Sequence, residues 1–309
     1  MSRPGTRSGR PERVLIRAYA GRVRPHDLVL LHGQPGLGSD WRQVIELLPD
    51  GIRAVSPDRP GHGASRLAGG GFDVSAGEVL RDLDARGVRR AVLVGHSYGG
   101  GVALTVAARA PERVEALVLL ASVGPGCLTG WDWLLAAPAA GEVCSLVAWK
   151  LTPWAARARL RLLARRDGTE DAVRQHVNWY VWGHARWDSG PLWRTFLAEQ
   201  RALVREAEGL AAAARRVSVP VLVMADPGDT MVPFRTAGAL ASLLPDARLR
   251  VIEGAGHHLP LRAPDRIAAE IVSFLDSLGS RAPGAPAGRP LPGGGPAQPR
   301  RSATIASTR

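Results

Sequence analysis

Residues 91–101 read Ala-Val-Leu-Val-Gly-His-Ser-Tyr-Gly-Gly-Gly, an apolar run that ends in a glycine-rich turn. Four apolar residues in succession are typical of a strand buried on both faces, and the segment after the glycines is typical of a helix. Residues 95–99 have the form G-x-S-x-G with Ser97 at the centre. A strand, a tight turn and a helix would present the Ser97 hydroxyl at the carboxyl end of the strand, near the positive end of the helix dipole. The alternative is an ordinary glycine-rich turn in which the serine has no chemical role.

Similar apolar runs alternate with helical patterns along most of the chain. The candidate strands are Val14–Tyr19, Leu28–Leu31, Ile52–Val55, Ala91–Val94, Val114–Leu120, Val221–Met224 and Arg248–Ile252. The candidate helices are Asp40–Leu48, Ser75–Ala85, Gly100–Arg109 and Pro264–Leu278. This alternation predicts an α/β fold with a mostly parallel central sheet flanked by helices.

The alternation stops near Ser122 and resumes near Val219. The segment between them is helical in character and contains eight of the nine tryptophans, namely Trp131, Trp133, Trp149, Trp154, Trp179, Trp182, Trp187 and Trp193. We therefore expect residues 126–214 to form a helical, Trp-rich cap inserted into a core made of residues 12–125 and 215–278. Two roles are open for the tryptophans, attaching the cap to the core and lining an apolar pocket.

The charge of the chain is concentrated at its two ends. The net charge is +12, of which residues 1–24 carry +6 and residues 279–309 carry +5, so residues 25–278 are nearly neutral at +1. The end segments 1–11 and 279–309 are rich in Arg, Pro and Gly and are expected to be disordered. No nucleic-acid-binding motif accompanies the arginines, so we expect no nucleic-acid partner.

Other classes of protein are disfavoured by what the sequence lacks. No apolar run reaches the roughly 20 residues of a membrane-spanning helix, and the basic N-terminus is not followed by the apolar region of a secretory signal. The two cysteines, Cys127 and Cys144, make neither a disulfide framework nor a zinc site. We expect a cytoplasmic protein with no membrane association, no metal and no cofactor.

A serine hydroxyl becomes a nucleophile only when a base accepts its proton. His257 lies in a Gly-Ala-Gly-His-His segment that follows the last predicted strand, so it would lie at the same sheet edge as Ser97. The neighbouring His258 competes with it, although the glycines before His257 favour His257. His96 is adjacent to the serine in sequence, which should point its side chain away.

The base in turn needs a carboxylate that orients its ring and stabilises the charged form. Asp229 follows the predicted strand Val221–Met224 and is the candidate. Asp226 competes, but it directly follows the strand and is more typical of a residue that forms a turn.

Acyl chemistry also needs donors for a developing oxyanion. Residues 32–36, His-Gly-Gln-Pro-Gly, follow the predicted strand Leu28–Leu31 and bring a second turn to the same edge. The backbone N–H groups of Gln34 and Tyr98 are the expected pair of donors. The alternative for residues 32–36 is a plain turn built from Gly and Pro.

Together these motifs resemble the α/β-hydrolase superfamily over about residues 12–278. The matching stretches are HGQPG at 32–36, DRPGHG at 58–63, GHSYGG at 95–100, Asp229 before Val232-Pro233, and Gly256-His257. The order serine, acid, histidine is also that of the family. The resemblance implies that Ser97 is the nucleophile, His257 the base and Asp229 the acid. It further implies that Gln34 and Tyr98 are the oxyanion donors and that residues 126–214 are the cap, while Asp58 shapes its loop.

The residue at position 97 bears on the type of reaction. Epoxide hydrolases and haloalkane dehalogenases of this superfamily use an aspartate there, and proline iminopeptidases carry HGGPG where this chain has HGQPG. We therefore expect a serine hydrolase that cleaves a carboxylic ester or related acyl compound through an acyl-enzyme on Ser97. Its substrate should be a small molecule, apolar or aromatic. The alternatives are a carbon–carbon bond hydrolase, a cofactor-free haloperoxidase-like enzyme, and a non-catalytic ligand-binding protein of the same fold.

Overall fold

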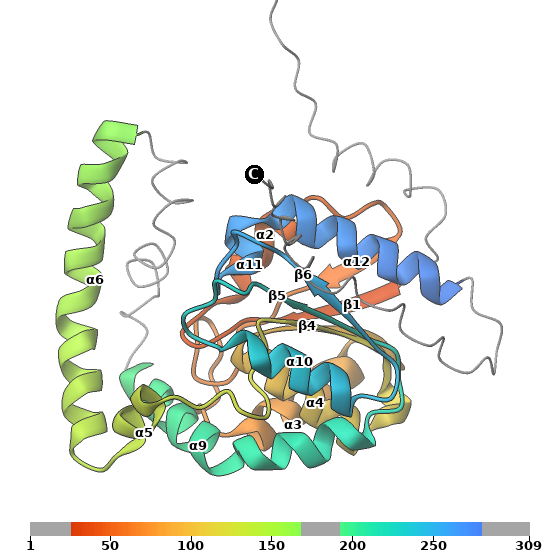
Figure 1. The fold of residues 1–309 in the computed structure, drawn as a ribbon, viewed down its shortest axis with the longest axis horizontal. Coiled ribbons are helices and arrows are strands. Elements are labelled where there is room, and N and C mark those ends of the chain that lie inside the picture. Colours follow the sequence, from red (N-terminus) through yellow and green to blue (C-terminus); the bar gives the residue numbers. More distant parts are fainter. Residues whose placement is uncertain (1–25, 168–191, 280–309) are drawn as a thin grey trace, which may run out of the picture.

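The computed structural model describes residues 26–167 and 192–279, which form a central sheet with helices on both faces (Figure 1). Six parallel strands lie in the order β2-β1-β3-β4-β5-β6. Their bounds are β1 His26–Leu31, β2 Ile52–Val55, β3 Ala91–His96, β4 Val114–Leu120, β5 Val221–Ala225 and β6 Ala247–Val251. The predicted α/β fold class is confirmed.

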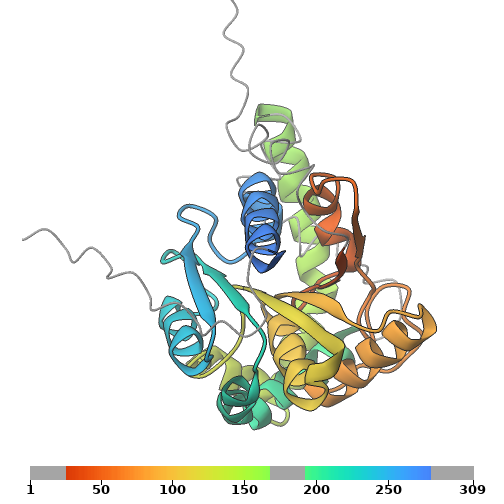
Figure 2. The same cartoon turned by 90° about the vertical axis from the view of Figure 1, so that its right-hand side faces the viewer.

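The helices form one layer on each face of the sheet. On one face lie α2 (Arg42–Ile45), α11 (Leu259–Arg262) and α12 (Pro264–Gly279), and on the other lie α3 (Phe72–Ala85), α4 (Tyr98–Arg109), α9 (Leu192–Arg216) and α10 (Phe234–Leu243). The view in Figure 2, turned by 90°, separates the two layers. The remaining described helices are α5 (Gly130–Ala136), α6 (Ala140–Asp167) and the 3-10 helices η1 (Gly38–Trp41) and η2 (Pro111–Arg113).

Two hydrophobic cores sandwich the sheet, because successive residues of a strand point to opposite faces. In β1, Leu28 and Leu30 belong to the core under α12, whereas Val29 and Leu31 belong to the core under α3 and α4. All four side chains are almost completely buried. Burial on both faces explains why the central strands are continuous apolar runs.

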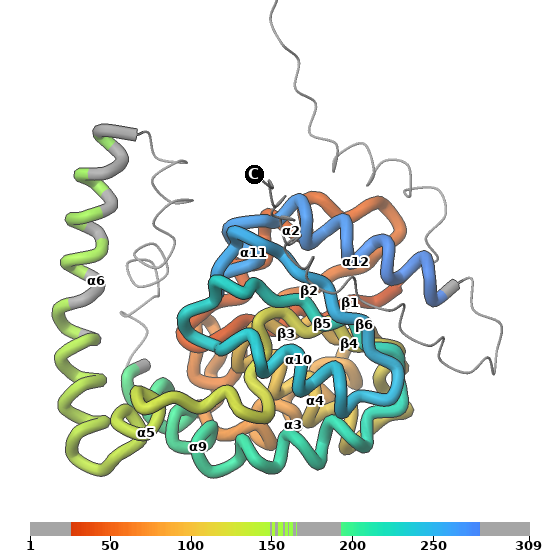
Figure 3. Tube along the Cα trace, viewed as in Figure 1, coloured from red at the N-terminus to blue at the C-terminus, as the bar shows by residue number. Residues whose placement is uncertain are grey.

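The parallel arrangement brings the functional loops to one edge of the sheet, since all strands end on the same side. Gln34 follows β1, Ser97 follows β3, Asp229 follows β5 and His257 follows β6. The pairing of Leu31 with Gly95 shows that β1 and β3 end at the same level. Figure 3 traces the chain through all six strands and the loops that follow them.

Some predicted bounds differ from the structure. The predicted helix Asp40–Leu48 is only η1 followed by the single turn of α2, because Pro49 disfavours a helical Leu48 and the chain turns back at once into β2. α4 begins at Tyr98 rather than Gly100, so the helix starts directly after the serine. β6 lies one residue earlier than predicted. The predicted strand Val14–Tyr19 lies outside the described residues.

Helices α5, α6 and α9 come between β4 and β5 in the chain, and we call them the inserted helices. They pack against one another, and α9 also packs against α3, α4 and α10. Trp131, Trp133 and Trp154 on these helices are largely exposed rather than packed against the core. Over residues 26–167 and 192–279, no helix is both long and apolar enough to cross a membrane.

Candidate active site

Ser97 sits at a sharp bend between β3 and α4. Its backbone has φ 53° and ψ −118°, in the left-handed region that residues other than glycine rarely adopt. The backbone N–H of Ser97 donates to the carbonyl of Leu120 (2.9 Å), and its carbonyl accepts from Gly100 (3.0 Å) and Val123 (3.1 Å). These bonds hold a strained conformation of the kind that is concentrated at functional sites.

The glycines beside Ser97 are needed because the backbones approach too closely for a side chain. A Cβ atom on Gly99 would lie 2.3 Å from the carbonyl oxygen of Leu31, and one on Gly95 would lie 2.4 Å from that of Gly99. The close approach of β1 therefore requires the glycine at 99, and the close approach of the first turn of α4 requires the glycine at 95.

Ser97, His257 and Asp229 form one chain of hydrogen bonds. The Nε2 atom of His257 lies 3.0 Å from the Oγ atom of Ser97, and its Nδ1 atom lies 2.8 Å from the Oδ2 atom of Asp229. With its proton on Nδ1, the imidazole donates to the carboxylate and leaves Nε2 free to accept the proton of the Ser97 hydroxyl. All three residues are buried, with exposures of 7% to 9%.

The other oxygen of Asp229 is held by backbone donors. Its Oδ1 atom accepts hydrogen bonds from the N–H groups of Met231 (2.7 Å) and Val232 (3.0 Å). Burial opposes ionisation, but the hydrogen bonds from His257 and from these two amides outweigh it and lower the pKa of Asp229. Asp229 is therefore a carboxylate at neutral pH, as the partner of an imidazolium must be.

The two competing residues have different positions. Asp226 accepts hydrogen bonds from the N–H groups of Gly228 (2.8 Å) and Gly256 (2.5 Å), so it ties the loop before His257 to the end of β5. His258 precedes α11, and no hydrogen bond of its side chain to Ser97 or Asp229 is found among the described residues. Asp229 and His257, the two residues that the sequence favours, are hydrogen-bonded to each other, and His257 is hydrogen-bonded to Ser97.

His96 supports the site in a way that the sequence did not indicate. Its Nε2 atom donates to the carbonyl of His257 (2.8 Å), and its ring centroid lies 5.0 Å from that of His257. Burial lowers the pKa of His96 to about 3, so the ring is neutral at physiological pH. Its position beside the serine was visible in the sequence, but its partner lies 161 residues away and had no local signal.

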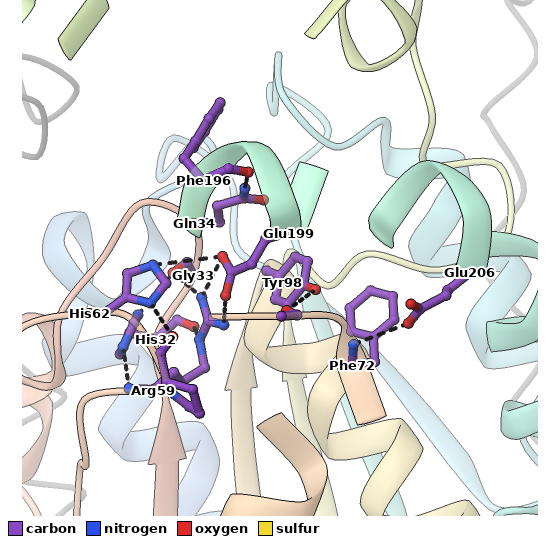
Figure 4. Close-up of polar contacts among 12 residues, drawn as sticks. His32, Gly33, Gln34, Arg59, His62, Phe72, Tyr98, Phe196, Glu199 and Glu206 are labelled. Carbon is purple, nitrogen blue, oxygen red and sulfur yellow. Dashed lines mark hydrogen bonds and ion pairs between the residues drawn. The ribbon is translucent and has the colours of Figure 1, made fainter. Parts of the chain in front are cut away.

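Gln34 and Tyr98, whose backbone N–H groups are the expected oxyanion donors, both line the cavity that contains Ser97. Tyr98 is the first residue of α4, where an N–H group has no acceptor within the helix. Gln34 lies in the turn after β1, and its side-chain amide donates to the carbonyl of Phe196 on α9 (2.7 Å; Figure 4).

The cavity at Ser97 has a volume of about 370 Å³ and lies between the sheet edge and the inserted helices. The sheet edge contributes Gln34, Ser97, Tyr98, Met231, Val232 and His257, and the inserted helices contribute Trp131, Leu135, Ser145, Phe196, Gln200 and Leu203. A more open cavity of about 570 Å³, lined by Asp58, Arg66 and Arg81 among others, contains none of the three hydrogen-bonded residues. Across the described ranges, no three His, Cys, Asp or Glu side chains gather as metal ligands would.

This fold agrees with comparisons to known proteins. Residues 28–270 match the pattern of the Alpha/beta hydrolase family. The chain belongs to the α/β-hydrolase family. The pimeloyl-[acyl-carrier protein] methyl ester esterase of Aromatoleum aromaticum is 32% identical over 253 residues, which cover 79% of this chain and 96% of that protein. This member of the family is thus an enzyme of the hydrolase class.

Two further proteins are similar to this chain, one in sequence and one in fold. The 2-hydroxymuconate semialdehyde hydrolase of a Pseudomonas species is 30% identical over 263 residues, covering 80% of this α/β-hydrolase and 86% of that protein. A thermophilic esterase from Thermogutta terrifontis matches in structure with a TM-score of 0.61, 21% identity and coverage of 83% and 91% of the two chains, a likeness of fold alone. Two other curated relatives are longer, and the chain spans only 27% and 63% of their lengths.

Proposed function

We propose that this α/β-hydrolase is a serine hydrolase that cleaves a carboxylic ester through an acyl-enzyme on Ser97. The observation that carries the proposal is the continuous hydrogen-bonded chain from Asp229 through His257 to the Ser97 hydroxyl. Its geometry suits the transfer of a proton from Oγ to Nε2 as Oγ attacks an ester carbon. The carboxylate at Nδ1 stabilises the imidazolium that results.

In the proposed reaction the tetrahedral intermediate carries its negative charge on the former carbonyl oxygen. The N–H groups of Gln34 and Tyr98 donate to this oxygen, and the N-terminus of α4 adds a favourable dipole. The protonated His257 then gives its proton to the leaving alcohol, which leaves the acyl group on Ser97. A water molecule, deprotonated by the same ring, attacks the acyl carbon, and the ring returns its proton to Oγ of Ser97 as the carboxylic acid is released.

We propose further that the inserted helices act as a cap over the substrate. They supply the wall of the cavity opposite Ser97, which is mainly apolar and includes Trp131, Leu135 and Phe196. A volume of about 370 Å³ suits a small molecule with an apolar or aromatic group. Cys127 and Cys144 are free thiols, which fits the reducing cytoplasm as the place of action.

The relatives leave an alternative reaction to be tested. The esterase similarity favours ester cleavage, and the semialdehyde hydrolase similarity keeps a carbon–carbon bond hydrolase as the alternative. An esterase should hydrolyse members of a panel of p-nitrophenyl esters of increasing acyl length and of aromatic esters. Turnover of a vinylogous 1,5-diketone with no turnover of any ester would favour the carbon–carbon bond hydrolase.

Labelling with a fluorophosphonate tests the nucleophile directly. The unmodified protein should be labelled on Ser97, and the Ser97→Ala variant should not be labelled. Ser242→Ala is the matched control, because Ser242 is exposed on α10 and its hydroxyl donates to the carbonyl of Gly238 on the same helix. Equal labelling of the Ser97→Ala variant and the unmodified protein would refute the assignment.

A further inference from the structure

A cluster of buried polar side chains packs against the turn that contains Gln34, and it comprises His32, Arg59, His62 and Glu199. Arg59, in the loop after β2, is 2% exposed and binds two successive carbonyls of this turn (Figure 4). Its Nε atom donates to the carbonyl of His32 (2.9 Å), and its Nη2 atom donates to the carbonyl of Gly33 (2.9 Å). The guanidinium therefore fixes the backbone directly before Gln34.

His32 strengthens the same arrangement. Its Nε2 atom accepts the backbone N–H of Arg59 (3.0 Å), which leaves the ring proton on Nδ1. That Nδ1 atom lies 2.9 Å from the carbonyl oxygen of Gly33, to which it donates. The carbonyl of Gly33 thus receives two hydrogen bonds, from His32 and Arg59, neither of which lines the cavity.

The hydrogen bonds to the Gly33 carbonyl also set the direction of the Gln34 N–H group. The carbonyl of Gly33 and the N–H of Gln34 belong to one planar trans peptide group, in which the two bonds point in opposite directions. Donors that hold the Gly33 oxygen on one side therefore turn the Gln34 N–H to the other. This is the N–H group proposed above as an oxyanion donor.

Arg59 is itself held by an inserted helix. Glu199 on α9 is completely buried, and both guanidinium Nη atoms donate to it, Nη1 to Oε1 and Nη2 to Oε2 at 3.3 Å (Figure 4). The side chain of Gln34 binds the carbonyl of Phe196, three residues earlier on the same helix. The turn and α9 are thus joined at two points one helical turn apart.

The charges in this cluster support an ion pair between Arg59 and Glu199. Burial, with a further contribution from Arg59, lowers the pKa of His62 to about 3 and holds the pKa of His32 well below its usual value, so both rings are neutral. Burial raises the pKa of Glu199 to about 7, and Arg59 limits the rise. The ring of Tyr98 lies against the guanidinium, 4.8 Å from its Cζ atom. The two bonds from the guanidinium to the carboxylate make Glu199 the anion against which Arg59 is held.

We propose that Glu199 is a positioning residue for catalysis, which acts through Arg59 to aim the Gln34 N–H at the oxyanion. This inference rests on the acyl-transfer chemistry proposed above. It makes the inserted helix α9 a part of the catalytic apparatus as well as a wall of the cavity. A purely structural ion pair would stabilise the fold without affecting the transition state selectively.

Steady-state kinetics on an activated ester at pH 8 test this role with the Glu199→Gln variant. The substitution keeps the shape and removes the charge, so Arg59 loses its anchor while the core stays filled. Because an error in position of about 1 Å costs on the order of 10²-fold, we expect kcat to fall about 10- to 100-fold. KM should change less than threefold, since Glu199 does not touch the substrate. The affinity for a trifluoromethyl ketone, which forms a tetrahedral oxyanion on Ser97, should fall in parallel with kcat/KM.

Glu206→Gln is the matched control. Glu206 lies on the same helix, and its carboxylate accepts the N–H of Phe72 at the start of α3 (3.1 Å), away from the Gln34 turn (Figure 4). This variant should lose stability but keep kcat within twofold. Arg59→Lys is a second probe, because lysine keeps the positive charge for Glu199 but lacks the planar fork that reaches two carbonyls. It should also lower kcat, by at least tenfold.

The outcomes separate this inference from the proposed function. If the folded Glu199→Gln or Arg59→Lys variant keeps full kcat, the positioning role is wrong while Ser97 labelling still stands. Equal losses of kcat in the Glu199→Gln and Glu206→Gln variants would likewise reduce Glu199 to a structural residue. If Glu199→Gln fails to fold, Arg59→Lys decides the question alone. Absence of ester hydrolysis in the unmodified protein would instead refute the proposed function.

Discussion

Asp229 and Asp226 lie three residues apart and both accept backbone hydrogen bonds, yet only Asp229 contacts His257. In Asp229→Asn the amide can no longer fix the tautomer of His257 or stabilise its charged form. We expect kcat for an ester to fall on the order of 10³- to 10⁴-fold, as measured by steady-state kinetics. Asp226→Asn should lower kcat much less, about tenfold or below, because Asp226 holds the backbone N–H groups of Gly228 and Gly256 and has no hydrogen bond to the His257 ring among the described residues. The reverse ranking of the two variants would contradict the assignment of Asp229.

The hydroxyl of Ser145 is a second single group with a predicted effect. Ser145 borders the cavity, is 2% exposed, and its Oγ atom has no hydrogen-bond partner among the described residues. A buried hydroxyl without a partner favours a ligand that supplies one. We predict that an ester whose acyl chain places a hydroxyl or keto group at the Ser145 hydroxyl has a lower KM than the alkyl ester of the same length. The difference should be about tenfold, which corresponds to one hydrogen bond of about 1.4 kcal/mol.

A series of acyl chains with the polar group at successive carbons would measure this effect. Ser145→Ala should remove the preference for the polar ester and leave the alkyl ester unaffected. If the preference is absent at every position, or survives in Ser145→Ala, the hydroxyl has no role in binding.

The junction of β3 and α4 depends on the absence of side chains at its glycines. In Gly99→Ala the new methyl group would lie 2.3 Å from the carbonyl oxygen of Leu31, so β1 and α4 must separate. We expect a loss of about 1–3 kcal/mol in the free energy of unfolding, together with a large loss of activity as Ser97 shifts. Urea unfolding and ester hydrolysis measure the two effects.

Gly77→Ala in α3 is the control for this junction. A Cβ atom on Gly77 would meet nothing within 4 Å, and alanine favours a helix over glycine by about 0.5–1 kcal/mol. Gly77→Ala should therefore stabilise the enzyme slightly and leave kcat unchanged. A Gly99→Ala variant as stable and active as Gly77→Ala would show that the close approach of β1 to α4 is not needed.

Buried ionisable groups make the stability of the whole enzyme depend on pH. Burial lowers the pKa values of four histidines. The pKa falls to about 3 for His62 and His96, and well below its usual value for His32 and His258. Unfolded histidines take up protons below about pH 6.5 and these folded ones do not, so acidification favours the unfolded state. Asp40 and Glu199 act in the opposite direction, because burial raises their pKa values to about 6 and about 7 and their folded forms bind protons first.

The four histidines outnumber the two carboxyl groups, so their effect prevails. We predict that the free energy of unfolding is highest above about pH 6.5 and decreases as the pH falls below it. Near pH 5.5 the unfolded chain should bind about two more protons than the folded enzyme. The free energy of unfolding should then fall by about 3 kcal/mol per pH unit. Urea unfolding at pH 7.0 and 5.5 measures the change. Glu199→Gln removes one opposing group and should steepen the dependence by about one proton, and a stability that rises toward pH 5.5 would contradict the prediction.

The strands and the loops after them were predictable because burial leaves a local pattern. Strands such as Ala91–His96, buried on both faces, are continuous apolar runs, and parallel strands bring their carboxyl ends to one edge. Strand order along the chain therefore predicted that the loops of Ser97, Asp229 and His257 would meet. The short helix after Gly38 was overestimated, since helical periodicity does not report how soon the chain must turn back into β2.

The amino-acid sequence by itself determined the fold class, the G-x-S-x-G turn and the small set of loops from which the site is built. The sequence favoured Asp229 over Asp226, but only the tertiary structure shows that the Asp229 carboxylate lies 2.8 Å from Nδ1 of His257 and that His96 donates to the His257 carbonyl. Tertiary structure alone joined Arg59 to Glu199, which lies 140 residues away on an inserted helix. The physical reason is that hydrophobic periodicity records whether a segment is buried, whereas the pairing of buried polar groups depends on directions and distances between distant segments.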